Sequence, residues 1–371
     1  MSLEVENDII RINNQLCDFS KDGTLFATAY QSNLTIKSNK KFDTIHSFVF
    51  PDIIEYLEWS RNSEYILCAN IKKAIIQVYS IRYPEWKYKL IEGSAGLESV
   101  NWSPDSKYIL TLSDFNKLIC GRLNSIDGIC WSPNSELLCI WSSFSDETKL
   151  IIYSTIFERD IAVFYPAHFQ NLKGIENVTW MPSGQLLAVT GFNEMIVLLN
   201  HVTWKPLLHL YLEPIIKENY LNKVYEERII QLNFSNKRNS YNKYILEEKS
   251  ERPINIKIGR KNNIERLSIA KFDILEFSSC GQYLAIKHQL YPTTLWIWNI
   301  IDDYLDYLLL ENAIVAAKWN PARAHLLIFC ECVHIFEWTP HNANCISSPR
   351  NITIVDARWH PQGNFFIIVW L

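Results

Sequence analysis

The sequence predicts an all-β fold, a β-propeller of four-stranded antiparallel blades, and three observations support this prediction. One short phrase recurs, in which an apolar run ends in Trp or Phe and is followed by Ser, often Pro, then Asp or Asn, then Gly or Ser. The phrase returns at intervals of roughly 40 residues, which is the length of one propeller blade. Of the 371 residues, 48% are hydrophobic, and 13 Trp, 18 Tyr and 18 Phe supply the aromatic residues that strands favour.

Eight aromatic anchors carry this phrase. In each copy the ring ends a buried strand, and the turn-forming residues after it supply a tight connection. The anchors are Phe19, Trp59, Trp102, Trp131, Trp180, Phe277, Trp319 and Trp359. Because each anchor opens one repeat, the count predicts seven or more blades, in a ring that the last repeat leaves incompletely closed.

Residues 175–210 contain one repeat that can be followed strand by strand. The pattern predicts strands over 175–180, 186–190, 195–199 and 206–210. Four antiparallel strands of about five residues make one blade. The third strand recurs at 76–80, 150–154, 295–299 and 333–338. Several copies end in Tyr-Ser or Trp-Asn where a WD repeat carries Trp-Asp, which indicates a divergent WD40-type repeat.

Two intervals between anchors depart from the period. A step of 29 residues precedes Trp131 and is too short for a complete blade, so we expect one repeat to be missing near 118–130. A step of 97 residues precedes Phe277 and predicts an insertion over 217–266.

The predicted insertion is polar and rich in Asn and Lys. From 217 to 271, 13 Lys or Arg stand against 7 Glu, in a chain whose net charge is −4. Such a composition buries little apolar surface, so we expect a mobile insertion between blades. A basic loop that docks a partner is the alternative.

The end of the sequence completes the predicted domain organisation. Residues 364–371 have the pattern of a second strand, with no third or fourth strand after them. An unfinished blade leaves an apolar edge, so we expect a shortened form, such as an isoform or a fragment. The predicted parts are a first group of repeats over 1–216, the basic insertion over 217–266, and a last group over 267–371 whose final blade is truncated.

Charge and cysteine content restrict the class of protein. A net charge of −4 gives no reason to expect a nucleic-acid partner. Residues 1–8 are acidic and polar, unlike a secretory signal, and no apolar run approaches the roughly 18 residues of a membrane span. The nine cysteines are odd in number and lie mostly in apolar runs. We therefore expect a soluble intracellular protein with free buried thiols and no membrane partner.

No motif in the sequence has the pattern of an active site. A Gly-x-Ser-x-Gly elbow, a phosphate-binding Gly-rich loop and a His-Glu-x-x-His helix are all absent. The best metal candidate is the alternating set Cys330, Cys332 and His334, which would share one face of a strand. A second pair of ligands is missing unless His325 or His341 contributes, so we favour a core strand over a zinc site. The sequence predicts neither an enzyme nor a cofactor nor a metal.

Two stretches go beyond the general pattern of a propeller. Residues 83–97, Tyr-Pro-Glu-Trp-Lys-Tyr-Lys-Leu-Ile-Glu-Gly-Ser-Ala-Gly-Leu, closely resemble a segment of the WD repeat-containing protein 8 family, which is centrosomal. Residues 199–205, Leu-Asn-His-Val-Thr-Trp-Lys, resemble a second segment of that family. The order of the turns also agrees over nearly the whole chain. Members carry an additional repeat at the short step and continue past residue 371, so the resemblance implies a chain that lacks both.

The resemblance implies a non-catalytic scaffold at the centrosome or spindle pole. Such a protein helps to anchor microtubule minus ends and supports spindle and cilium assembly. The implied partners are a coiled-coil centriolar-satellite adaptor and a minus-end-directed kinesin or proteins associated with γ-tubulin. The implied location is the cytoplasm, at the cytoskeleton and the centrosome. A propeller scaffold in another intracellular complex, such as a ubiquitin ligase or one related to translation, remains the alternative.

Partner-binding residues are expected in the two stretches that carry the resemblance. Exposed Trp is a typical interface anchor, and propellers bind through loops on their faces. The candidate residues are Pro84, Glu85, Trp86, Glu92, Gly93, Ser94, Gly96, His201 and Trp204. The alternative for the same residues is that they pack one blade against the next.

Overall fold

The computed structural model divides the chain into two compact units. It describes residues 9–91, 96–113, 126–143, 148–168, 172–219, 221–233, 240–259, 270–348 and 352–370. The N-terminal unit takes its described residues from Glu6–Gln170 and Arg358–Phe366, and the C-terminal unit takes them from Asn171–Ala357 and Ile367–Leu371. Strands make up both units, and the helical structure in these ranges is one 3-10 turn at Pro166–His168. The described residues contain no helix that could span a membrane.

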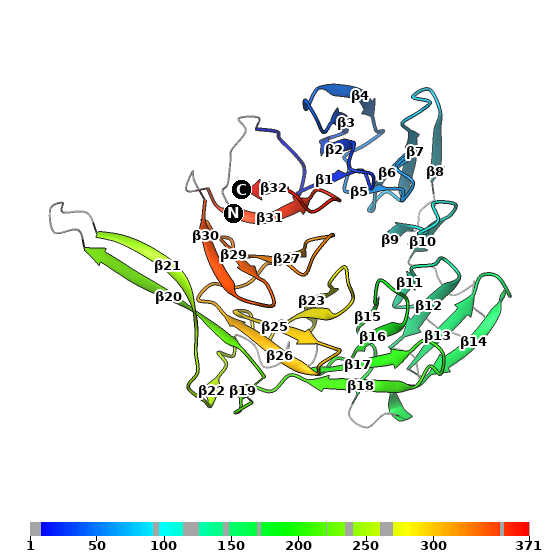
Figure 1. The fold of residues 1–371 in the computed structure, drawn as a ribbon. Coiled ribbons are helices and arrows are strands. Elements are labelled where there is room, and N and C mark those ends of the chain that lie inside the picture. Colours follow the sequence, from blue (N-terminus) through cyan, green and yellow to red (C-terminus); the bar gives the residue numbers. More distant parts are fainter. Residues whose placement is uncertain are drawn as a thin grey trace. The chain divides into compact units, whose positions relative to one another are not determined.

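The N-terminal unit contains repeats 1 to 4, and each begins with an anchor strand. Repeat 1 consists of β1 (Cys17–Phe19), β2 (Leu25–Tyr30), β3 (Asn33–Ser38) and β4 (Thr44–Val49). Repeat 2 consists of β5 (Tyr56–Trp59), β6 (Tyr65–Asn70), β7 (Ile75–Ser80) and β8 (Lys87–Ile91). Repeat 3 has β9 (Leu97–Trp102) and β10 (Ile109–Ser113). Repeat 4 consists of β11 (Gly128–Trp131), β12 (Leu137–Ser142), β13 (Lys149–Ser154) and β14 (Arg159–Phe164) (Figure 1).

The C-terminal unit contains repeats 5 to 7 and part of repeat 8. Repeat 5 consists of β15 (Asn177–Trp180), β16 (Leu186–Thr190), β17 (Met195–Asn200) and β18 (Pro206–Tyr211). Repeat 6 consists of β23 (Phe272–Phe277), β24 (Tyr283–His288), β25 (Thr294–Asn299) and β26 (Tyr304–Leu309). Repeat 7 consists of β27 (Ala316–Trp319), β28 (Leu326–Phe329), β29 (His334–Trp338) and β30 (Ala343–Ser347). Repeat 8 has β31 (Ile354–Trp359) and β32 (Phe366–Trp370).

The blades are of the predicted type, but their number is not. Six repeats form antiparallel meanders in which the four strands are neighbours in chain order, as the sequence predicts. Repeats 3 and 8 contribute two paired strands each within the described residues. The described residues therefore form six four-stranded blades and do not support the predicted seven or more. Counting anchors gave a larger number because an anchor marks only the first strand of a repeat and carries no information about its third and fourth strands.

The turn after each anchor shows why the phrase uses Ser followed by Asp or Asn. In repeat 1 the Ser20 hydroxyl donates to Asp22 Oδ1 at 2.6 Å, and Ser20 Oγ accepts from Leu25 N at 2.9 Å. Asp22 Oδ1 also accepts from Thr24 N at 3.1 Å. The side chains thus satisfy backbone groups of a tight turn. The same pattern returns in repeats 2, 3 and 4.

Hydrogen bonds also link the turns of successive repeats in the N-terminal unit. In each link the backbone N–H of the turn Asp or Asn donates to a serine hydroxyl in the next turn. The three links join Asp22 to Ser63 at 3.0 Å, Asn62 to Ser106 at 3.0 Å, and Asp105 to Ser135 at 2.8 Å. The three serines have φ of 61°, 63° and 63°. Glycine adopts this left-handed region most easily, but it would lack the hydroxyl that makes the link.

The last repeat packs part of its turn against repeat 1. Arg358 Nε donates to Cys17 O at 3.0 Å, and His360 Nε2 lies 3.1 Å from Gly23 O. The rings of Phe19 and Phe365 are 5.8 Å apart and edge to face, an arrangement that aromatic pairs prefer. All of these residues belong to the N-terminal unit, which therefore combines the first repeats with residues near the other end of the sequence.

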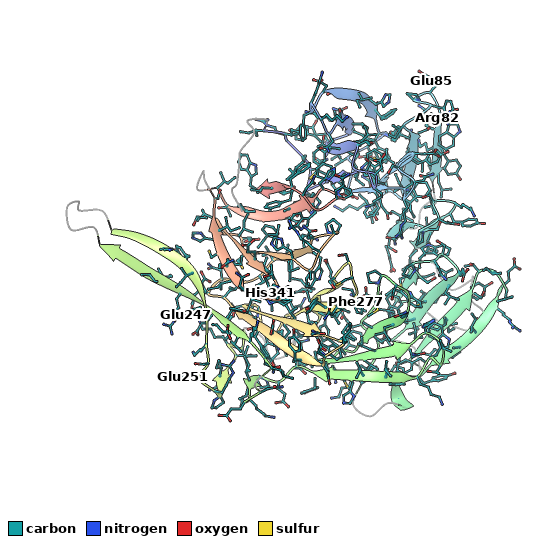
Figure 2. The ribbon with its side chains drawn as sticks, in the orientation of Figure 1. Arg82, Glu85, Glu247, Glu251, Phe277 and His341 are labelled. Atoms are coloured by element: carbon teal, nitrogen blue, oxygen red, sulfur yellow. The ribbon has the colours of Figure 1, made fainter. Side chains whose placement is uncertain are left out.

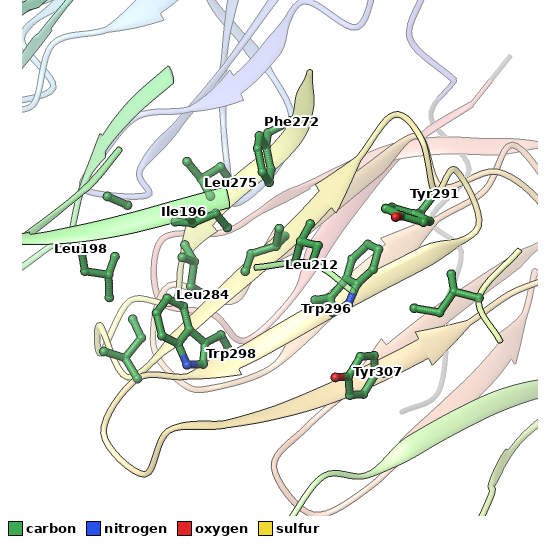
Figure 3. Packing of buried hydrophobic residues seen from close by; sticks show 14 of the residues in the cluster. Ile196, Leu198, Leu212, Phe272, Leu275, Leu284, Tyr291, Trp296, Trp298 and Tyr307 are labelled. Atoms are coloured by element: carbon green, nitrogen blue, oxygen red, sulfur yellow. The ribbon is translucent and has the colours of Figure 1, made fainter. Parts of the chain in front are cut away.

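The C-terminal unit has one buried cluster between the sheets of repeats 5 and 6 and another between those of repeats 6 and 7. Figure 3 shows Ile196 and Leu198 of β17 with Leu284 of β24, Trp296 and Trp298 of β25. All five side chains are buried. Burial of apolar surface on this scale is the main stabilising contribution in such a fold.

Residues of the predicted insertion form strands in the structure. β19 (Ile215–Ile216) pairs with β22 (Ile254–Asn255), while β20 (Val224–Asn233) and β21 (Ser240–Glu248) form a long hairpin. β20 also pairs in parallel with β26, which extends the sheet of repeat 6 to six strands. The polar composition did not predict these strands. The boundaries at 217–266 and the role of this segment as a docking loop remain predictions.

Candidate interaction surface

Three of the predicted site residues, Pro84, Glu85 and Trp86, lie in the turn between β7 and β8. The end of the third strand sets this turn, because Ser80 Oγ accepts from Tyr83 N at 3.1 Å. Trp86 N then donates to Tyr83 O at 2.9 Å and closes the turn. Figure 2 shows Arg82 and Glu85 together at the tip of this hairpin. The turn is thus a fixed and exposed element of repeat 2.

Trp86 packs against the blade and is also partly exposed to solvent. Its ring lies 5.6 Å from that of Tyr65, and Tyr65 in turn stacks on Trp102 of repeat 3 at 6.2 Å. Even so, 48% of Trp86 is exposed. The guanidinium of Arg82 lies 5.4 Å from the centre of the Tyr83 ring, and Tyr83 is 61% exposed. An aromatic ring held on one side and open on the other is suited to contact a partner.

The strand that follows the turn is exposed along almost its whole length. β8 pairs with β7, with Tyr88 opposite Val78 and Leu90 opposite Ile76. Lys87, Tyr88, Lys89 and Ile91 are exposed and Leu90 is half-buried. Sequence reasoning missed this strand as part of the site, although its alternation of Lys with Tyr and Leu is the available signal. The turn and β8, residues 82–91, are called the β8 surface below.

The other candidates near this surface are only partly described. Gly96 is half-buried and directly precedes β9. Glu92, Gly93 and Ser94 lie outside the described residues. No contact between them and Trp86 is therefore available to support their predicted role.

His201 and Trp204 occupy the turn between β17 and β18 in the C-terminal unit. Trp204 has φ of 56°, and its N–H donates to Asn200 O at 2.8 Å. Its ring meets that of Trp180 edge to face at 6.0 Å, within the same repeat. His201 is exposed, and its Nδ1 lies 3.0 Å from Gln185 O. The turn corresponds to that of Trp86, between a third and a fourth strand, but the two tryptophans belong to different units.

A half-buried carboxylate in β5, at the opposite edge of the sheet from β8, joins repeats 2 and 3. Glu58 Oε2 accepts from Trp102 N and from the Tyr56 hydroxyl, both at 3.0 Å. Burial raises the pKa of Glu58, although these two hydrogen bonds lower it. Burial and the neighbouring Glu58 charge raise the pKa of Tyr56. Glu58 has a structural role, because its hydrogen bond to Trp102 connects β5 of repeat 2 to β9 of repeat 3.

The cysteine and histidine set weighed as a zinc site lies in the core of repeat 7. Cys330 and His334 are buried, and Cys332 Sγ donates to His334 O at 3.4 Å. His334 Nδ1 lies 3.2 Å from Ser347 Oγ, and its ring is 4.0 Å from that of Tyr244. Burial raises the pKa of the Cys332 thiol. In the described ranges no group of three or more His, Cys, Asp or Glu could hold a metal ion.

Comparisons with curated proteins show two relatives, whereas no family model matches the chain. WD repeat-containing protein WRAP73 of Mus musculus is 26% identical over 440 residues, covering 96% of this chain and 92% of the relative. That relative is WD repeat-containing protein 8, so the resemblance found in the sequence is confirmed. The alignment is longer than this 371-residue chain, so part of the relative has no counterpart here.

The second relative is an uncharacterized WD repeat-containing protein of Schizosaccharomyces pombe. It is 23% identical over 299 residues, covering 77% of this chain and 55% of the relative, so the match spans about half the length of that protein. Two solved structures are also similar. The crystal structure of the mitotic checkpoint complex gives a TM-score of 0.49 at 9% identity, covering 100% of this chain and 94% of the matched chain. The Cps50 (Swd1) β-propeller domain of Myceliophteria thermophila gives 0.48 at 14% identity, covering 92% and 98%.

Proposed function

The chain belongs to the WD-repeat family, and on that premise we propose that it is a non-catalytic scaffold at the centrosome or spindle pole. In this role it helps to anchor microtubule minus ends and supports spindle and cilium assembly. It does so by binding a coiled-coil centriolar-satellite adaptor, in the cytoplasm and at the cytoskeleton. The observation that carries the proposal is the similarity to WRAP73 over 96% of the chain.

The exposed aromatic residues of the β8 surface support a binding role. Tyr83, Trp86 and Tyr88 are all more than 40% exposed and lie within six residues of one another. Aromatic side chains dominate the energetics of protein interfaces when a partner buries them. The half-buried Tyr56 and Glu58 of the same repeat, by contrast, are engaged in hydrogen bonds with each other and with Trp102. The geometry therefore supports recognition of another protein better than it supports chemistry.

The adaptor-binding role can be tested with a double substitution. Trp86→Ala together with Trp204→Ala removes the two tryptophans of the third-to-fourth turns. We expect co-precipitation of the adaptor to be lost, because truncation of an interface anchor typically costs at least about 2 kcal/mol, or roughly 30-fold in affinity. Retained binding by a folded double variant would reject these residues as the site.

Phe157→Ala provides a matched control for this experiment. Phe157 lies in the third-to-fourth turn of repeat 4, is 67% exposed, and donates its N–H to Ser154 Oγ at 3.1 Å. Tyr83 makes the same bond to Ser80. We expect the control to co-precipitate the adaptor normally. Localisation of the tagged wild-type chain away from the centrosome, without the adaptor, would favour a scaffold in another complex.

A further inference from the structure

The outer edge of repeat 2 is open to a further strand. In the described part of the chain β8 is the last strand of its sheet and pairs with β7 alone. An unpaired edge presents backbone N–H and C=O groups that another chain can use. Repeat 6 shows that an outer strand of this protein accepts such an addition, because β20 pairs with β26. The corresponding position beside β8 is unfilled among the described residues.

One face of this edge is also less covered than its counterpart in repeat 1. By register, Leu90 and Tyr88 of β8 correspond to Phe48 and His46 of β4. Phe48 is only 9% exposed, because Tyr79 from the third strand of repeat 2 stacks on it at 4.6 Å. Its counterpart Leu90 is half-buried, and Tyr88 is 48% exposed whereas its counterpart His46 is half-buried. The described residues of repeat 3 supply no third strand that could cover it.

The charge of the edge selects what it can bind. Lys87 and Lys89 give β8 two positive charges and no acid, whereas the fourth strands of the other described blades carry no lysine. The two lysines alternate with Tyr88 and Leu90, so the positive and apolar side chains point to opposite faces of the sheet. Residues of an added strand that lie beside Lys87 and Lys89 would therefore favour acids, and those beside Tyr88 and Leu90 would favour apolar side chains.

From this arrangement we propose that β8 binds an extended segment of a partner protein, in which acidic and apolar residues alternate, as a further strand of the sheet of repeat 2. This inference rests on the proposed scaffold function and names the surface and the chemistry of the partner segment. Backbone hydrogen bonds along the edge hold the segment, and the alternating side chains set its register. Trp86 and Tyr83 flank the beginning of β8 and add aromatic contacts there.

The proposal can be tested with synthetic peptides as probes. Fluorescence anisotropy would measure the binding of a labelled ten-residue peptide of alternating glutamate and valine. A peptide of alternating lysine and valine serves as the opposite-charge probe. We expect the wild-type chain to prefer the glutamate peptide, and we expect Lys87→Glu with Lys89→Glu to weaken that binding at least about tenfold. Higher salt should weaken the wild-type interaction.

Lys40→Glu with Lys41→Glu is the matched control. Both lysines are exposed and lie in the third-to-fourth turn of repeat 1, so the change of net charge is the same. We expect its affinity to stay within about twofold of the wild type, since both lysines belong to another sheet and exposed charges outside the contact are screened. Absence of glutamate-peptide binding, equal binding of both peptides, or equal losses in the two double variants would overturn the inference.

The same variants separate this inference from the proposed function. If the wild-type chain fails to reach the centrosome or to co-precipitate the adaptor, the proposed function fails. Peptide binding that depends on Lys87 and Lys89 would then still support the β8 site. If the wild type binds the adaptor but shows no selective peptide binding, the scaffold proposal stands and the β8 inference is rejected.

Discussion

Asp306 offers the sharpest test of how burial and hydrogen bonding act in this fold. The carboxylate is 1% exposed, in the outer strand of repeat 6. Its Oδ2 accepts from Trp338 Nε1 at 3.2 Å, and its Oδ1 accepts from Lys223 N at 3.1 Å. It therefore joins repeat 6 to repeat 7 and to the base of the β20–β21 hairpin. The informative perturbation is Asp306→Asn, which keeps the shape and removes the ionisation.

The magnitude follows from the pKa of this group. Burial raises the pKa of Asp306 to about 6 from an ordinary value of 3.8, although the hydrogen bonds from Lys223 and Trp338 lower it. Between pH 4 and pH 6 the folded protein thus keeps a proton that the unfolded chain has released. The free energy of unfolding must then decrease as the pH rises through this window, by about 3 kcal/mol in total. The Asn variant has no such proton.

Urea unfolding of both proteins at several pH values, followed by circular dichroism, would measure this effect. The free energy of unfolding of the wild type minus that of Asp306→Asn should fall by about 3 kcal/mol from pH 4 to pH 7. Contributions of the other carboxylates cancel in this difference. Trp338→Phe should move the change to higher pH, because the indole N–H stabilises the carboxylate. A difference that does not vary with pH would refute the reasoning.

Three further predictions concern the turns and the hairpin. Ser63→Ala should lower the free energy of unfolding by about 1 kcal/mol, because the N–H of Asp22 loses its acceptor while residue 63 keeps its left-handed φ. A urea titration would measure this, and an unchanged midpoint would show that the link does not contribute to stability. Gly23→Ala should lower the free energy of unfolding by about 1–3 kcal/mol, because the new Cβ would lie 2.5 Å from His360 Nε2 and residue 23 has a φ of 74°. A melting temperature equal to that of the wild type would contradict this prediction. Deletion of 217–266 should abolish co-precipitation of a partner if the segment is a docking loop, and retention of every partner would reject that role; because the deletion also removes β20 and the Lys223 bond to Asp306, circular dichroism must show that the variant is folded.

The first strands of the repeats could be predicted because their signal is local. Each anchor, including Trp59 and Trp180, is the last residue of a first strand in the structure. An aromatic residue followed by Ser and Asp marks the turn, because the turn is built from those side chains. The repeat read over 175–210 also agrees with the structure, in which β16 covers Leu186–Thr190 as predicted.

The number of blades and the added strand could not be predicted in the same way. A blade is complete only if third and fourth strands follow, and the anchor carries no information about them. The pairing of β20 with β26 joins Val224 to Tyr307, residues too far apart in the sequence for a local pattern to reveal. The polar composition of β20 instead favoured a segment without regular structure.

The candidate site could be predicted only in part, because a single sequence does not show which tryptophan side chains are exposed to solvent. Trp59 and Trp86 are both tryptophans beside apolar strands, yet Trp59 is buried and Trp86 is half exposed. The difference arises because Trp59 ends an inner strand, where its Nε1 donates to Asp18 O at 3.2 Å. Trp86 lies in the turn that precedes an outer strand. The resemblance pointed to the turn before β8, whose role in binding remains a prediction, and the lysines and Tyr88 of β8 emerged only from the register of the sheet.

The hydrogen-bonded links between turns define a structural unit smaller than a blade, which is the anchor with the turn that follows it. Asn62 and Asp105 connect repeat 3 to the repeats before and after it, although only its first two strands are described. Every group in these links belongs to a turn between a first and a second strand, so none of the three links depends on a third or fourth strand. Loss of an anchor turn would therefore break the series, whereas a change in an outer strand would leave these hydrogen bonds intact.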